Sequence, residues 1–167
     1  MQKGIALIGM PASGKTTISR ELAARLNRPL LDVDQWMEAH EKRPLSETIA
    51  TKGKKYTLDL ETACIRDHDL RELILSTPGS IIYNDVLDLL REKTHIIWLD
   101  VPFEVIEERL APDVDNQRGV IGLKEKGLRA LYDERTPLYR KWATHTIDCG
   151  DKDVEAIVLE IAKIAMP

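Results

Sequence analysis

The stretch Gly9-Met10-Pro11-Ala12-Ser13-Gly14-Lys15-Thr16 decides the fold of this 167-residue chain. It has the pattern G-x-x-x-x-G-K-[ST], in which glycines let backbone N–H groups curve around an anion and a helix N-terminus adds a partial positive charge. The apolar run at 5–8 before it predicts a buried strand, and apolar residues every four positions after it, at Ile18, Leu22 and Leu26, predict a helix. This context indicates a phosphate-binding loop.

A loop of this kind fits a purine nucleoside triphosphate, here taken as ATP, together with Mg²⁺. Lys15 can reach the outer phosphates as a point charge, and the Thr16 hydroxyl can ligate Mg²⁺. The expected nucleotide-binding residues are Gly9, Met10, Pro11, Ala12, Ser13, Gly14, Lys15, Thr16 and Thr17. The alternative interpretation is a plain glycine turn followed by a surface lysine.

Short apolar strands alternate with amphipathic helices along the rest of the chain, which is typical of a parallel sheet with helices on both faces. Further strands are expected at 29–31, 80–83, 95–99 and 146–149, and helices at 34–40, 55–75, 85–93, 102–112, from 124 onward and at 154–164. Asp34 and Asn84 are expected to cap the helices that follow them.

The whole chain, 1–167, is therefore predicted to be one α/β domain. The expected fold is a three-layer α/β/α P-loop NTPase with a central, mainly parallel five-stranded sheet. Residues 113–122 are polar and contain Gly119 and Gly122, so they are expected to form a mobile lid. An acceptor-binding helical region is expected at about 34–75.

Charge and composition argue against several functions. The chain has 24 Lys and Arg against 28 Asp and Glu, a net charge of -4, without the basic stripe that a nucleic-acid binder needs. Its apolar runs are too short for a membrane-spanning helix or a secretory signal. Cys64 and Cys149 lie far apart and form no metal-type pair. We therefore expect a cytoplasmic monomer that binds a small molecule, with no nucleic-acid or membrane partner.

Two carboxylates follow the second predicted strand. Asp32 and Asp34 stand two residues apart, so both side chains project to the same side of an extended backbone. Ligands bind beyond the carboxyl ends of parallel strands. Asp32 is therefore expected to hold Mg²⁺ directly or through water, and Asp34 to orient an acceptor hydroxyl and take its proton. In the alternative, Asp34 only caps the next helix and Asp32 is solvated.

The phosphate loop, Leu31-Asp32-Val33-Asp34, and Glu134-Arg135-Thr136-Pro137-Leu138-Tyr139 followed by Ala143 resemble the shikimate kinase family over nearly the whole chain. The resemblance implies that Asp32 serves the magnesium site and that Asp34 binds the acceptor hydroxyls. It also implies that Arg135 binds the acceptor carboxylate, that Arg118 closes over the phosphates from the lid, and that Arg109 borders the adenine.

The expected catalytic residues are thus Lys15, Asp34 and Arg118. A cation delivered by a closing loop stabilises the charge of the transition state and excludes water. The alternatives are an ordinary exposed loop arginine at 118, and an ion pair of Arg135 with Asp133 or Glu134.

Two stretches depart from the family pattern. The family has an arginine early in its long third helix, where this chain has Leu58 and Asp59, with Lys54 and Lys55 as possible replacements. The family's Gly-Gly-Gly turn is replaced by Pro78-Gly79-Ser80, so only Gly79 carries over as an acceptor-binding residue. Because proline removes a backbone donor, we expect an acceptor pocket with a different shape and different hydrogen bonds.

The sequence thus predicts an ATP-dependent kinase that transfers the γ-phosphate to a hydroxyl of a small molecule. The resemblance makes shikimate the leading acceptor and implies a role in aromatic amino acid biosynthesis. Two alternatives stay open: a kinase for another polyol or hydroxy acid such as gluconate, and a non-catalytic nucleotide-sensing domain. A nucleoside monophosphate kinase fits less well, because Asp-x-Asp suits a hydroxyl acceptor.

Asp100 is either a second magnesium carboxylate or, as we favour, a helix cap.

Overall fold

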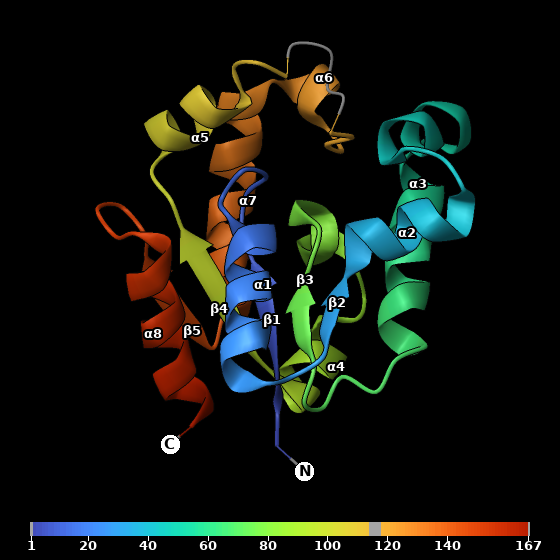
Figure 1. Ribbon diagram of the computed structural model, residues 1–167. Coiled ribbons are helices and arrows are strands. Elements are labelled where there is room, and N and C mark those ends of the chain that lie inside the picture. The colour runs from blue at the N-terminus through green and yellow to red at the C-terminus, as the bar shows by residue number, and fades with distance from the viewer. Residues whose placement is uncertain (1, 114–117, 167) are drawn as a thin grey trace.

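A five-stranded parallel sheet forms the centre of the computed structural model, which describes residues 2–113 and 118–166 (Figure 1). Its strands are β1 (Gly4–Ile8), β2 (Leu30–Asp32), β3 (Ile74–Ser76), β4 (Thr94–Asp100) and β5 (His145–Asp148), in the spatial order β2-β3-β1-β4-β5 with every neighbouring pair parallel. Every residue of β1 is buried, as expected for a central strand that has helices on both faces. The predicted α/β class is confirmed.

Helices cover both faces of this sheet. They are α1 (Lys15–Leu26), α2 (Val33–Glu41), α3 (Leu45–Arg66), α4 (Leu87–Lys93), α5 (Phe103–Leu110), α6 (Leu123–Lys126), α7 (Leu128–Trp142) and α8 (Val154–Ala165). In Figure 1, α1 and α8 lie in front of the sheet and α4 and α7 behind it, while α2 and α3 stand together beyond β2. The carboxyl ends of β1, β2 and β3 meet at one edge, so the segments that follow them share a common crevice.

The third strand lies elsewhere than predicted. The helix expected at 55–75 ends at Arg66, and the strand expected at 80–83 is a 3-10 helix, η1 (Gly79–Tyr83). The strand that pairs with β1 and β2 is Ile74–Ser76. A three-residue apolar run carries no periodicity that separates a strand from the end of a helix, so pairing in the sheet decides between the two.

The predicted helix caps are wrong as well. Asp32 caps α2, because β2 extends one residue further than expected and the Asp32 Oδ1 accepts a hydrogen bond of 3.1 Å from the backbone N of Gln35. Asp34 therefore lies inside the first turn. Helix α4 begins at Leu87, so Asn84 precedes it by three residues and its amide binds Glu61 instead. Asp100 does not cap α5 either, since Pro102 occupies the N-cap position.

Among the residues that the structure describes, no helix combines the length and the apolar character needed to cross a membrane.

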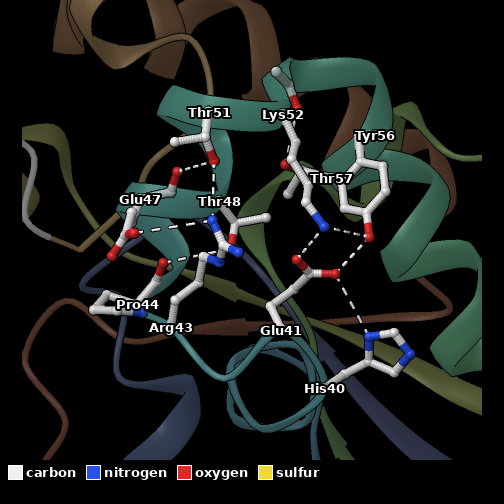
Figure 2. Close-up of polar contacts among 11 residues, drawn as sticks. His40, Glu41, Arg43, Pro44, Glu47, Thr48, Thr51, Lys52, Tyr56 and Thr57 are labelled. Atoms are coloured by element: carbon white, nitrogen blue, oxygen red, sulfur yellow. Dashed lines mark hydrogen bonds and ion pairs between the residues drawn. The ribbon is translucent and has the colours of Figure 1, made fainter.

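Helix α3 bends at Gly53, whose φ of 85° and ψ of 174° interrupt the helical geometry. This combination of a positive φ with an extended ψ is readily adopted by glycine alone. The end of α2 holds both sides of the bend through one carboxylate: Lys52 before the bend donates to Glu41 at 2.6 Å, and the Tyr56 hydroxyl after the bend also donates to it (Figure 2). We call Glu41, Lys52 and Tyr56 the α3 clamp. These hydrogen bonds lower the pKa of Glu41 to about 2.

We expect the variant Glu41→Gln to lower the melting temperature at pH 7. Because the pKa of Glu41 is depressed in the folded protein, its stabilising effect is present above the ordinary value of 4.5 and is lost as the pH falls toward about 2. Thermal unfolding of both proteins over this range should therefore show a difference that shrinks as the pH falls. Glu47→Gln is the control. Glu47 is exposed and its ion pair with Arg43 is long, at 3.9 Å, so its loss should change stability little. A difference independent of pH would contradict the expectation.

Candidate active site

The loop between β1 and α1 has the curvature that an anion site requires. Gly9 and Gly14 have φ angles of 151° and 96°, and Gly14 is the N-cap of α1. Gly14 has no side chain to occupy the N–H groups of the first helical turn, so these groups are available to a phosphate. At Gly9, an added Cβ would lie 3.0 Å from the carbonyl oxygen of Leu99, so the close approach of β4 also demands a glycine there.

Lys15 lies inside this loop. Its Nζ donates to the carbonyl oxygens of Gly9 and Met10 at 2.9 and 2.8 Å, and the residue is only 8% exposed. Burial lowers the pKa of Lys15 to about 8, although nearby Asp34 opposes the shift. With the Ser13 hydroxyl at 3.4 Å, the ammonium group has three neutral partners, whereas a bound polyphosphate would offer charged ones.

The two aspartates occupy different environments at the end of β2. Asp32 is close to the loop, since the Thr16 hydroxyl donates to its Oδ2 at 3.4 Å. Asp34 is more deeply placed, and burial, followed by the charge of Asp32, raises its pKa to about 6. Its Oδ1 is buried and has no hydrogen-bond partner within the described part of the chain. An orphaned carboxylate oxygen of this kind can accept a proton or a hydrogen bond from a ligand.

One cavity of about 660 Å³ joins the phosphate loop to α3, η1 and α7. Of the predicted site residues, it is bordered by Pro11, Ala12, Gly14, Lys15, Thr16, Thr17, Asp34, Gly79, Arg109, Arg118 and Arg135. The other predicted residues, Gly9, Met10, Ser13 and Asp32, are also described but lie outside the lining. A volume of this size suits small-molecule ligands.

Two of the predicted arginines, Arg109 and Arg118, border both this cavity and a smaller one beside it. Arg109 donates through Nη1 to the carbonyl oxygen of Ala12 at 2.9 Å, which connects α5 to the phosphate loop. Arg118 borders the same cavity and, with Arg109 and Pro112, a smaller neighbouring one of about 300 Å³. The central part of the predicted lid, 114–117, lies outside the described residues.

Arg135 is 1% exposed and lies on α7, where its Nη1 approaches Gly79 at the start of η1. Its Nη2 donates to the carbonyl oxygen of Ile121 at 2.8 Å, and its Nε has no partner among the described residues. The ion pairs considered from the sequence do not form, because Asp133 binds Arg129 and Glu134 binds Lys126. A ligand carboxylate would supply the charge that this buried guanidinium lacks.

Gly79 separates Arg135 from the phosphate loop. An added Cβ at this position would lie 2.7 Å from Arg135 Nη1 and 3.2 Å from the carbonyl oxygen of Gly9. The Tyr139 hydroxyl donates to the carbonyl oxygen of Gly79 at 2.7 Å. The absence of a side chain at this position therefore allows the two halves of the cavity to approach each other.

The sequence interpretation missed several polar residues on the cavity wall: Thr57, Glu61, Ser76, Thr77 and Ser80. Glu61 is the most informative, because it is 1% exposed and its carboxyl group binds the Ser80 hydroxyl and the Asn84 amide. Burial raises the pKa of Glu61 to about 8. One signal was available: Glu61 lies on the same helical face as buried Leu60, Cys64 and Ile65, and a glutamate in an apolar stripe is unusual.

The lysines considered as replacements for the family arginine lie outside the cavity lining. Lys55 pairs with Asp59 at 2.7 Å on the exposed side of α3. The Lys54 Nζ lies 5.1 Å from the centre of the Tyr83 ring. Neither lysine borders the cavity in this structure, and the difference of the acceptor pocket from the family pattern stays a prediction.

Phosphoryl transfer requires a held polyphosphate, an acidic group near the acceptor, and cations around the transferred group. This cavity provides residues for all three, which defines the class as a P-loop kinase that acts on a small molecule. The shikimate kinase family model matches residues 11–165. The chain belongs to the shikimate kinase family, whose members are ATP-dependent kinases of a hydroxyl group.

Individual relatives and structures agree with this assignment. The chain is 35% identical to a shikimate kinase of Helicobacter hepaticus, over 96% of this chain and 92% of that one. It is 29% identical to a shikimate kinase of Dictyoglomus turgidum, over 96% of both chains. A shikimate kinase from Acinetobacter baumannii in complex with shikimate superposes with a TM-score of 0.87 at 26% identity, covering 98% of this chain and 93% of that one. A gluconokinase from Sinorhizobium meliloti shares the fold alone. It superposes with a TM-score of 0.58 at 18% identity, covering 98% of this chain and 94% of that one.

We expect Lys15→Ala to weaken the binding of Mg·ATP by at least about 30-fold, because the variant removes the buried lysine of the phosphate loop, the expected partner of the polyphosphate. Calorimetric titration of both proteins measures this difference. Lys163→Ala is the matched control, since Lys163 is exposed on α8. Equal affinities of the Lys15 variant and the unchanged protein would contradict the assignment of the loop.

We expect Gly79→Ala to raise the KM for the acceptor by about tenfold, equivalent to about 1.4 kcal/mol, because the new methyl group displaces the Arg135 guanidinium. Steady-state kinetics with each substrate varied in turn measures the effect. An unchanged KM for the acceptor would show that Arg135 has room to move without loss of binding.

Proposed function

We propose that this protein transfers the γ-phosphoryl group of ATP to a hydroxyl of shikimate, with Mg²⁺ as the metal ion. The observation that carries the proposal is that Lys15, Asp34 and Arg135 border one cavity. Shikimate has hydroxyl groups for Asp34 and a carboxylate for Arg135. The likeness to the Acinetobacter baumannii enzyme in complex with shikimate supports the same acceptor.

Asp34 is proposed to hold the reacting hydroxyl and to take its proton. Its buried Oδ1 has no partner within the described residues, so an acceptor hydroxyl would satisfy it. A carboxylate within hydrogen-bond distance of an alcohol makes the oxygen a better nucleophile as the new bond to phosphorus forms.

Lys15 and Arg118 are proposed to stabilise the negative charge that spreads over the phosphoryl oxygens during transfer. Lys15 lies on the loop side and Arg118 borders the same cavity after α5. The N–H groups at the start of α1 face the same charge, and Arg109 is proposed to border the adenine.

Thr16 and Asp32 are proposed to hold Mg²⁺. Their side-chain oxygens, 3.4 Å apart, are the hard ligands that this ion prefers. In the described part of the chain no group of three or more histidine, cysteine or acidic side chains could hold a metal, which suits an ion that shares its coordination with phosphate oxygens. When bound, Mg²⁺ supplies neutralisation of phosphate charge.

Arg135 is proposed to bind the acceptor carboxylate, for which a planar guanidinium offers paired N–H donors. We also propose that 1–167 acts as one catalytic domain, with α2 and α3 on the acceptor side. That the protein is a monomer in the cytoplasm and binds no nucleic acid stays a prediction.

We expect shikimate to stimulate ADP release in a coupled assay far more than gluconate, nucleosides or nucleoside monophosphates. The variant Asp34→Asn should lower kcat by about 10²- to 10⁴-fold, the range of general-base catalysis, with the affinity for ATP kept. Stronger stimulation by gluconate would identify another acceptor. Tight nucleotide binding without stimulation by any acceptor would favour a nucleotide-sensing domain.

A further inference from the structure

Glu61 connects α3 to both ends of η1. Its Oε2 accepts a hydrogen bond of 2.6 Å from the Asn84 amide nitrogen, at the end of η1. Its Oε1 forms a hydrogen bond with the hydroxyl of Ser80, near the start of η1. Glu61 is 1% and Ser80 4% exposed, and both border the cavity that contains the proposed acceptor site. The pair is therefore placed to contact a ligand there.

The surroundings of Glu61 favour its neutral form. Asp34 on α2 raises its pKa, whereas Arg135 on α7 lowers it, and the largest effect is burial, which gives a pKa of about 8. Tyr139, also on α7, is neutral because burial raises its own pKa to about 12. The two hydrogen bonds from η1 lower the pKa of Glu61 but do not offset burial. Burial therefore favours the protonated form of this carboxyl group at neutral pH.

The position of that proton follows from the hydrogen bonds. In the structure the Ser80 hydroxyl donates to Oε1. In the neutral acid this direction can reverse: Oε2 accepts an N–H of Asn84, so Oε1 can carry the acid proton and donate it to the Ser80 oxygen. The Ser80 hydroxyl hydrogen is then no longer needed for Glu61 and is available to a ligand in the cavity. When Glu61 loses its proton, the Ser80 hydroxyl donates to the carboxylate instead and the ligand loses this donor.

We propose that Ser80 binds the acceptor directly by donating a hydrogen bond to one of its oxygens, and that protonated Glu61 is the positioning residue that makes this donor available. The inference rests on the proposed function, because the ligand is the acceptor of the kinase reaction. It assigns a preference for an acceptor that presents a hydroxyl or carboxylate oxygen to η1.

The test is steady-state kinetics with shikimate at saturating Mg·ATP between pH 7 and pH 9. We expect Ser80→Ala to raise the KM for shikimate at pH 7 by about tenfold, with the KM for ATP unchanged. Thr94→Val is the matched control, since Thr94 is also buried but its hydroxyl donates to Leu90 in the α4–β4 connection. Ser80→Gly removes the same hydroxyl and replaces Ser80→Ala in this test if the alanine variant does not fold.

Glu61→Gln separates a positioning role from a structural one. A glutamine can donate to the Ser80 oxygen and accept from Asn84, as the neutral acid does, so this variant should keep the KM for shikimate at pH 7. In the unchanged protein this KM should rise as the pH passes about 8, and in Glu61→Gln the rise should be smaller. Lys15 has a pKa of about 8 in the ligand-free protein and is present in both the unchanged protein and Glu61→Gln. The difference between the pH profiles of these two proteins therefore reports on Glu61.

The two proposals fail in different ways. The inference is overturned and the proposed function stands if the unchanged protein phosphorylates shikimate but one of two results is seen. Either Ser80→Ala has the same KM for shikimate as the unchanged protein, or Glu61→Gln has the same pH dependence of this KM as the unchanged protein. If calorimetry and the coupled assay detect neither binding nor turnover of shikimate by the unchanged protein, the proposed function is overturned and the inference with it.

Discussion

The active site depends on a turn of backbone that directs N–H groups toward one point in space. Strand β1 is buried throughout, and the chain leaves it through Gly9 and enters α1 through Gly14. Neither position tolerates a side chain well, Gly9 because β4 is close and both because of their positive φ. The sheet fixes where the turn lies, and the turn fixes where a polyphosphate can be held. The other catalytic groups are useful only in relation to that position.

Around the turn, the protein places charged groups where protein partners are few. Lys15 contacts neutral carbonyl oxygens, Asp34 has an orphaned oxygen, and Arg135 has an unpaired Nε within the described residues. Burying charges in this way is unfavourable unless they are paired. A phosphorylated nucleotide and an acidic, hydroxylated acceptor would complete these interactions, so part of their binding free energy comes from satisfying groups that the folded chain leaves unsatisfied.

Local signals explain what the sequence could predict. The glycine pattern of the phosphate loop and the four-residue spacing of Ile18, Leu22 and Leu26 act within a few residues, and the structure has the expected strand, turn and helix there. The choice between 74–76 and 80–83 as the third strand depends on pairing with β1 and β2, which are distant in sequence. The apolar stripe around Glu61 marks its position, but its partners Ser80 and Asn84 come from another element, so the sequence could not predict these contacts.

The hydrogen bond from Arg135 to the backbone of Ile121 has a stereochemical consequence. It commits one side of the guanidinium to the protein, so a carboxylate has to approach the N–H groups that are left. In the proposed complex, the angle of that approach would orient the ring that carries the carboxylate, and with it the hydroxyl presented to Asp34. In this arrangement, regioselectivity among several chemically similar alcohols would depend on a single main-chain oxygen, that of Ile121.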